Sequence, residues 1–262
     1  MAIIIKTEEE IAKLREGGKR LGTILAKVAA RIAPGVSTYD LDAYARELIA
    51  AGGDTAAFLN YQPYGASYPY PAALCTSVNG EVVHGIPKKE VILKDGDVVA
   101  IDLGLKHEGL FTDHALSVPV GKVSKETAQL LAVTKAALEE GIFAIQPGAR
   151  VGDIGHAIES YIKKFGDGKN TYGIVDILSG HGVGREIHED PFVPNYGKKG
   201  TGALLKPGMV IAIEPMVNLG TKEVVLDKDG YTYKTEDGKK SAHFEHTVLI
   251  TDTGAEILTL AQ

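Results

Sequence analysis

Four acidic residues are the strongest candidates for chemistry in this sequence of 262 residues. Asp102 and Glu214 each interrupt an apolar run, and Asp113 and Glu245 lie in short runs of strand-forming residues. An ionised carboxylate in apolar surroundings is unfavourable unless it is paired with a cation or binds a metal. The types and surroundings of these residues therefore predict a buried, charged site.

An internal repeat relates these acids as two pairs. The segment 93–102 resembles 205–214, and the segment 111–114 resembles 243–246 in the same order along the chain. Repeated segments of this kind commonly form related halves that pack about a pseudo-two-fold axis. Such an axis would bring all four carboxylates to one place.

Four carboxylates at one buried place would repel each other strongly. Two divalent cations would balance the four charges, and oxygen ligands suit metals such as Mn, Fe or Co. A bridging hydroxide would complete such a site as the nucleophile. The plainer alternative is a structural cluster of salt bridges, but few basic residues lie near these acids in the sequence. We therefore predict a dinuclear metal centre.

Histidines supply the remaining candidates. His181 stands between glycines in GHGVG, which we interpret as a loop whose small residues let the imidazole approach a ligand. His188 follows shortly after it, and His84 lies in the segment VVHGIP. A single histidine is more often a surface or hydrogen-bonding residue, and we keep this interpretation for His107 and His156. The phosphate-loop, HExxH and serine-elbow patterns do not occur in the sequence.

The elements that must position these residues are helices and short strands. Apolar periodicity and capping signals predict helices at 7–33, 39–51, 124–145 and 151–165. Strand-forming runs are expected at 73–78, 98–103, 110–118, 210–214, 232–235 and 242–250. The segment 60–71 is rich in Tyr, Pro and Gly and indicates an irregular loop. A turn at 104–109 would let Asp102 and Asp113 face each other across a hairpin.

The composition is that of an ordinary globular protein, with 44% hydrophobic and 24% charged residues. A net charge of -6 argues against a dominant nucleic-acid-binding surface. No apolar run is long enough to cross a bilayer, and the first residues lack the order of a secretory signal. A single cysteine, Cys75, excludes an internal disulfide and favours a reducing compartment. We expect a cytoplasmic protein without a membrane or nucleic-acid partner.

Six features of the sequence resemble type I methionine aminopeptidases, and the likeness extends over nearly the whole chain. They are SVNGEVVHGIP at 77–87, LKDGDVVAIDLG at 93–104, the acid Asp113, SGHGVGREIHEDP at 179–191, LKPGMVIAIEPM at 205–216 and SAHFEHTVLIT at 241–251. The resemblance implies the pita-bread fold of the α/β (α+β) class. Two pseudo-symmetric α/β halves would surround a central antiparallel sheet, with helices outside. One catalytic domain would span 1–262, with halves of roughly 1–120 and 121–262.

The same resemblance implies a role for each matching position. Five residues would bind two divalent ions, of Co, Mn, Fe or Zn: Asp102, Asp113, His181, Glu214 and Glu245. Asp113 and Glu245 would bridge the ions, and Glu214 would also shuttle a proton. His188 would contact the substrate near the scissile carbonyl and His84 near the peptide nitrogen. A methionine pocket would be formed by Tyr70, Cys75 and Tyr231.

The implied activity is hydrolysis of the first peptide bond by a metal-bound hydroxide, which removes N-terminal methionine before a small second residue. The substrates would be nascent chains, so we expect a transient ribosome contact and a monomeric enzyme. An X-Pro aminopeptidase or prolidase is one alternative, although Met216 stands where those enzymes carry glycine. A non-catalytic binding protein of the same fold is another, although such proteins lose ligands that are present here.

Overall fold

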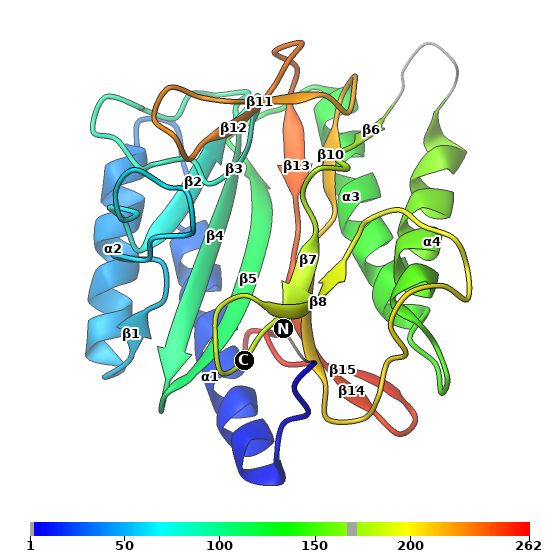
Figure 1. The fold of residues 1–262 in the computed structure, drawn as a ribbon. Coiled ribbons are helices and arrows are strands. Elements are labelled where there is room, and N and C mark those ends of the chain that lie inside the picture. The colour runs from blue at the N-terminus through cyan, green and yellow to red at the C-terminus, as the bar shows by residue number, and fades with distance from the viewer. Residues whose placement is uncertain (1–2, 167–171) are drawn as a thin grey trace.

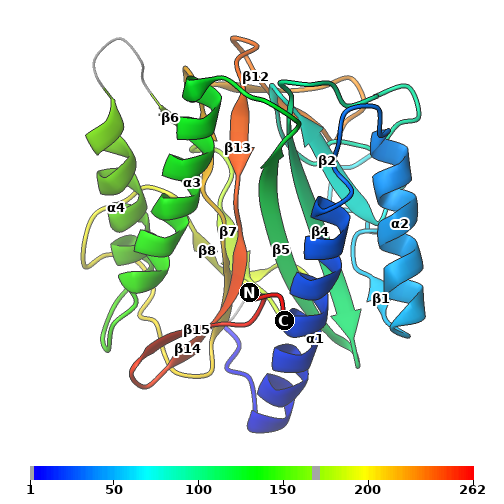
Figure 2. The same cartoon turned by 180° about the vertical axis from the view of Figure 1, so that it is seen from behind.

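The computed structural model describes residues 3–166 and 172–262, and its helices lie on one side of its strands (Figures 1 and 2). The helices of the described residues are α1 (Glu8–Ala29), α2 (Thr38–Ala51), α3 (Lys125–Phe143), α4 (Val151–Ile162) and the short 3-10 helix η1 (Lys163–Phe165). Thr7 and Glu10 form the predicted capping box, with the Thr7 amide 2.8 Å from the Glu10 carboxylate. The first helix ends at Ala29, earlier than predicted, because turns occupy the residues before Pro34.

Every strand pair in the described residues is antiparallel, and the pairs form four sheets. The first contains β1 (Thr55–Ala56), β2 (Leu74–Val78), β4 (Val98–His107) and β5 (Leu110–Pro119). The second contains β7 (Gly180–Gly182), β8 (Glu189–Val193), β9 (Val210–Ile213), β14 (His246–Thr251) and β15 (Gly254–Ile257). Two smaller sheets contain β6 (Gly173–Ile174), β10 (Met216–Asn218) and β13 (Ser241–His243), and β3 (Glu81–Val83), β11 (Val224–Leu226) and β12 (Tyr233–Thr235).

The two larger sheets have the same internal order. In the first, β4 lies between β2 and β5, and in the second, β9 lies between β7 and β14. One buried apolar cluster packs α1 and α2 against β2 and β4, and another packs α3 and α4 against β9 and β14. This equivalence matches the pseudo-symmetric fold that the repeat predicts, while the exact boundaries of the halves stay a prediction.

The two larger sheets meet at a seam formed by β5 and the start of β14. The Glu245 amide donates to the Ala115 carbonyl at 2.8 Å, and the Thr247 hydroxyl donates to the Asp113 carbonyl at 2.7 Å. The Asp113 amide in turn donates to the Thr247 hydroxyl at 2.9 Å. The seam therefore places Asp113 and Glu245, the second repeat-related pair of acids, side by side.

The observed limits of three predicted strands differ from the prediction at positions that matter for the site. β4 continues through Gly104 to His107, so the hairpin turn consists of Glu108 and Gly109 only. β9 ends at Ile213, and Glu214 follows it. The strand predicted at 242–250 is two strands, because β13 pairs with β10 whereas β14 pairs with β9. The chain changes sheets between them, at the position of Glu245.

None of the helices in the described residues combines the length and the apolar character needed to cross a bilayer.

Candidate functional site

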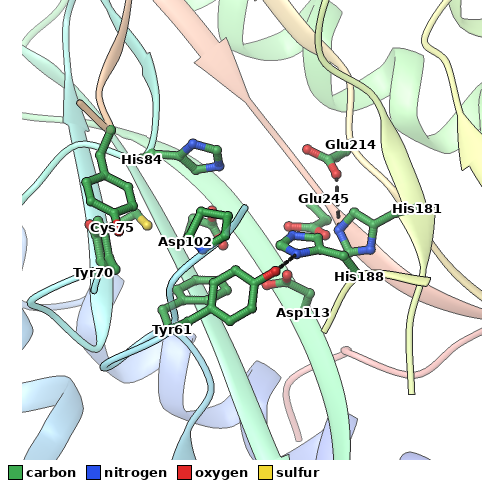
Figure 3. A pocket seen from close by; sticks show the side chains of 13 residues that line it. Tyr61, Tyr70, Cys75, His84, Asp102, Asp113, His181, His188, Glu214 and Glu245 are labelled. Atoms are coloured by element: carbon green, nitrogen blue, oxygen red, sulfur yellow. Dashed lines mark hydrogen bonds and ion pairs between the residues drawn. The ribbon is translucent and has the colours of Figure 1, made fainter. Parts of the chain in front are cut away.

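All ten residues that were predicted to form the site line one cavity of about 130 Å³ (Figure 3). Aromatic side chains lie on one side of it, and the histidines 181 and 188 with Glu214 lie on the other. The full lining is Phe58, Tyr61, Pro63, Tyr70, Cys75, His84, Asp102, Asp113, His181, His188, Glu214, Tyr231 and Glu245. Residues from both halves of the chain therefore converge on a single place.

The β4–β5 hairpin positions the first two acids. Asp113 lies opposite Gly104, and Asp102 lies opposite Ala115, so that the two acids are diagonal neighbours on one face of the hairpin. Both side chains are buried. The predicted approach of Asp102 to Asp113 is thus observed, through a longer hairpin than the sequence indicated.

The remaining acids approach from the second half of the chain together with His181. The possible ligand atoms of Asp113, His181 and Glu245 all lie within 4.8 Å of one another. His181 Nε2 is 3.5 Å from Glu214 Oε1. This spacing is suited to donors that surround a cation.

His181 lies in a short strand, so the predicted loop was wrong. A Cβ atom on Gly180 would lie 2.3 Å from the Ala212 carbonyl oxygen, and one on Gly182 would lie 2.2 Å from the Asp190 carbonyl oxygen. The flanking glycines are required because neighbouring backbones press against β7 on both sides. Since His181 Nδ1 lies 2.9 Å from the Gly182 carbonyl, it donates its proton there and leaves the Nε2 lone pair free for a metal.

Burial raises the pKa of all four acids and so favours their protonated forms. It raises the pKa of Asp113 to about 7, with the Glu214 charge adding to the effect, and raises the pKa of Glu214 to about 8. Burial and the neighbouring acids also raise the pKa of Asp102 and of Glu245 well above the usual range. A cation at the site would reverse these effects, because it stabilises the ionised forms.

Two further observations indicate that the four carboxylates and His181 are suited to binding divalent cations. One oxygen each of Asp102 and Glu245 is buried without a hydrogen-bond partner in the described residues. Burial, with His188 nearby, lowers the pKa of His181 to about 3, so that its imidazole is neutral and able to bind a metal. Unpartnered carboxylate oxygens and a neutral imidazole are the ligands that borderline divalent metals use.

The two other predicted histidines face the same space. Burial lowers the pKa of His84 to about 4, and His84 has a φ of 59°, a left-handed conformation that is uncommon outside glycine. The rings of His188 and His181 are 4.5 Å apart at 71°, and His188 Nδ1 is 3.0 Å from the Tyr61 hydroxyl. Both imidazoles are therefore neutral hydrogen-bonding groups beside the acids.

The predicted methionine pocket forms the apolar end of the cavity. The rings of Tyr70 and Tyr231 pack edge to face with centroids 5.2 Å apart, and the Tyr70 hydroxyl donates to the Gly85 carbonyl at 2.9 Å. Burial raises the pKa of the Cys75 thiol well above its usual range, so the thiol is neutral. The pocket therefore suits an apolar side chain.

The sequence did not single out several residues that contribute to the site. Tyr61, Phe58 and Pro63 line the cavity from in or beside the predicted irregular loop, where functional residues are common. His243 Nε2 lies 3.4 Å from Glu214 Oε2, so imidazoles lie on both sides of that carboxylate. His114 donates from Nδ1 to the Glu245 carbonyl at 2.5 Å. The acid next to His114 and the acid two residues after His243 were the only local signals.

Comparisons with known proteins agree with this geometry. Residues 12–252 match the model of metallopeptidase family M24. The chain is 48% identical to the methionine aminopeptidase of Aquifex aeolicus (strain VF5), with 99% of each chain covered. It is 43% identical to methionine aminopeptidase 1 of Bacillus subtilis (strain 168), with 98% of this chain and 99% of the relative covered.

Solved structures of methionine aminopeptidases and of prolidases both resemble this chain, but to different degrees. The crystal structure of methionine aminopeptidase from Thermotoga maritima matches with a TM-score of 0.92 at 43% identity, covering 99% of this chain and 100% of that chain. A prolidase from Pyrococcus furiosus matches with a TM-score of 0.73 at 26% identity, and the match covers 99% of this chain and 66% of that chain. The likeness to the methionine aminopeptidase is therefore the stronger of the two.

Proposed function

The chain belongs to metallopeptidase family M24, and from this membership we propose that it removes the N-terminal methionine of newly made proteins, with a preference for a small second residue. One observation carries the proposal. The four carboxylates and His181 line the same cavity as the apolar pocket of Tyr70 and Cys75. A metal site for hydrolysis and a pocket for an unbranched apolar side chain thus adjoin each other.

We propose that two divalent ions, of Co, Mn, Fe or Zn, bind here. Their ligands would be Asp102, Asp113, His181, Glu214 and Glu245, with Asp113 and Glu245 shared. When bound, the ions would lower the pKa of a water and polarise the scissile carbonyl. Asp113 and Glu245 are suited to being shared because the seam between the sheets holds them together.

The protein's own side chains orient the substrate. Tyr70, Cys75 and Tyr231 would enclose the methionine side chain and exclude water from it. His188, held by Tyr61, would donate a hydrogen bond to the scissile carbonyl, and His84 would contact the peptide nitrogen. These imidazoles are neutral at neutral pH because burial lowers the pKa of each.

Glu214 is the group best placed to move a proton. Burial raises its pKa to about 8, and its two carboxylate oxygens lie 3.5 Å from His181 and 3.4 Å from His243. A carboxylate between two imidazoles, in the cavity that would hold the substrate, is placed to accept a proton and pass it to the leaving amine. Glu214 would therefore act as the proton shuttle.

Methionine release by metal-stripped protein with added Mn, Fe or Co tests the proposal. Release from Met-Ala-Ser that depends on the metal supports it, and cleavage of Ala-Pro-Ser alone would identify an X-Pro enzyme instead. Failure to bind any divalent metal would favour the non-catalytic alternative. We also propose that the enzyme acts in the cytoplasm as a monomer, in transient contact with the ribosome. Sedimentation with and without ribosomes tests the oligomeric state and the ribosome contact.

A further inference from the structure

A second cavity of about 320 Å³ adjoins the first one. The two cavities share four lining residues, which are His84, His181, His188 and Glu214. Tyr70, Cys75 and Tyr231 line only the first cavity, whereas Ile177, Leu178, Phe192 and Met216 line only the second. The residues assigned to the scissile bond therefore separate the methionine pocket from this second space.

This arrangement sets the direction of a bound peptide. If methionine fills the first cavity and the scissile bond lies at His84 and His188, the chain beyond that bond must enter the second cavity. An extended chain advances about 3.3 Å per residue and its side chains alternate between faces. The second residue then lies at the shared wall, and the third reaches the outer part of the cavity.

The outer part of the second cavity has an exposed apolar rim. Ile177, just before β7, is 64% exposed, and Phe192, on β8, is 73% exposed. Single exposed apolar residues are common on protein surfaces, but two large ones from separate segments that face the same cavity indicate a binding site. Covering them with an apolar group would remove their surface from water.

Charge at the same rim also disfavours an acidic ligand. Glu189 lines the cavity, but its carboxylate is 2.5 Å from Lys6 Nζ and is neutralised by it. Asp190 and Glu214 are the other two acids among the lining residues, and neither lysine nor arginine lines the cavity in the described residues. An acidic side chain is therefore disfavoured in this cavity, and the exposed Ile177 and Phe192 favour an apolar one.

We propose that this second cavity is a binding site for the third residue of the substrate, with a preference for an apolar side chain held between Ile177 and Phe192. The inference rests on the proposed function and deepens it, because it makes the enzyme sensitive to a residue beyond the small second one. The occupant is a segment of the substrate chain, since the cavity is continuous with the site that cleaves it.

The test compares two peptides that differ only at the third position, Met-Ala-Leu-Gly-amide and Met-Ala-Ser-Gly-amide, on the metal-loaded enzyme. Partial burial of the leucine side chain should raise kcat/KM by about threefold to tenfold. Phe192→Ser and Ile177→Ser should bring this ratio towards one. Phe143→Ser, which alters a 77% exposed residue on α3, is the matched control and should keep the ratio.

Equal kcat/KM values for the two peptides in the unaltered enzyme would overturn the inference, as would a ratio that survives in both rim variants. Absence of methionine release from either peptide would overturn the proposed function instead. In that case, direct binding of the two peptides decides the inference separately. If the leucine peptide binds more tightly than the serine peptide and Phe192→Ser abolishes this difference, the site is supported. Equal binding of the two peptides would overturn the inference.

Discussion

Lys6 and Glu189 form an ion pair that is almost completely buried, with Lys6 Nζ 2.5 Å from Glu189 Oε2 and with only 4% and 6% of the two residues exposed. The other oxygen of Glu189 accepts hydrogen bonds from the amides of Arg185 at 2.6 Å and Glu186 at 3.0 Å. The pair thus joins the segment before α1 to the loop that carries His188.

Replacing Lys6 with methionine should destabilise the protein by about 3 to 5 kcal/mol, because it leaves the Glu189 carboxylate buried without a cation. Urea unfolding measures this change. The double variant Lys6→Met/Glu189→Gln should lose less than the sum of the single variants, because the two residues are in contact. Lys13→Met, which breaks an exposed pair with Glu9, is the control and should change little. Simple additivity in the double variant would contradict the proposed coupling.

The ion pair of Glu10 with Arg185 should make stability depend on acidity. The hydrogen bond from Arg185 lowers the pKa of Glu10 from 4.5 to about 2 in the folded protein. Because the folded value is the lower one, the stabilisation is complete above pH 4.5 and is lost as the pH falls towards 2. The melting temperature of Glu10→Gln should lie below that of the unaltered protein at pH 7 and approach it near pH 2.

This difference should be small and should shrink in high salt, because the pair is exposed. Glu8→Gln removes the same charge from the same helical turn without removing a partner of Arg185, and it controls for the helix dipole. If the melting temperatures of Glu10→Gln and the unaltered protein differ by the same amount from pH 7 to pH 2, the ion pair with Arg185 is not the cause of the difference.

The substitution Asp113→Asn should abolish methionine release and weaken the binding of Mn²⁺ by more than about a hundredfold. Loss of a residue that only supports a metal ligand costs up to about a hundredfold, and loss of a ligand should cost more. Asp113 is expected to contact both ions, and the amide is a poorer ligand than the carboxylate. Titration calorimetry on metal-stripped protein measures the affinity. His107→Ala is the control, since His107 Nδ1 pairs with Asp54 at 2.7 Å and lies outside the cavity lining. Equal losses in both variants would break the site assignment.

Loss of the Tyr61 hydroxyl should impair catalysis through His188. Tyr61→Phe removes the 3.0 Å hydrogen bond to His188 Nδ1, and we expect kcat/KM for Met-Ala-Ser to fall by about threefold to tenfold. Tyr64→Phe, in the same loop but fully exposed, should have no effect and is the matched control. An unchanged kcat/KM in Tyr61→Phe would show that this contact does not position His188 for the reaction.

The family, the fold class and the activity could all be predicted from the sequence alone, and the comparisons confirm all three. This was possible because the diagnostic residues lie in continuous segments, such as the one from Leu205 to Met216, that can be read without knowing what they contact. The repeat also predicted which acids would lie together. Asp102 lies on β4 and Glu214 directly follows β9, whereas Asp113 lies on β5 and Glu245 directly precedes β14, in two sheets of the same order.

The contacts that hold this site in place could not be predicted from the sequence and are seen only in the folded chain. The partners of Lys6, Tyr61 and Glu214 lie far away in the sequence, and local periodicity contains no information about them. The structure also showed that Glu245 lies where the chain changes sheets, because strand limits depend on which neighbouring strand accepts the hydrogen bonds. In this protein the local sequence specified the chemical groups, and long-range backbone pairing specified their arrangement.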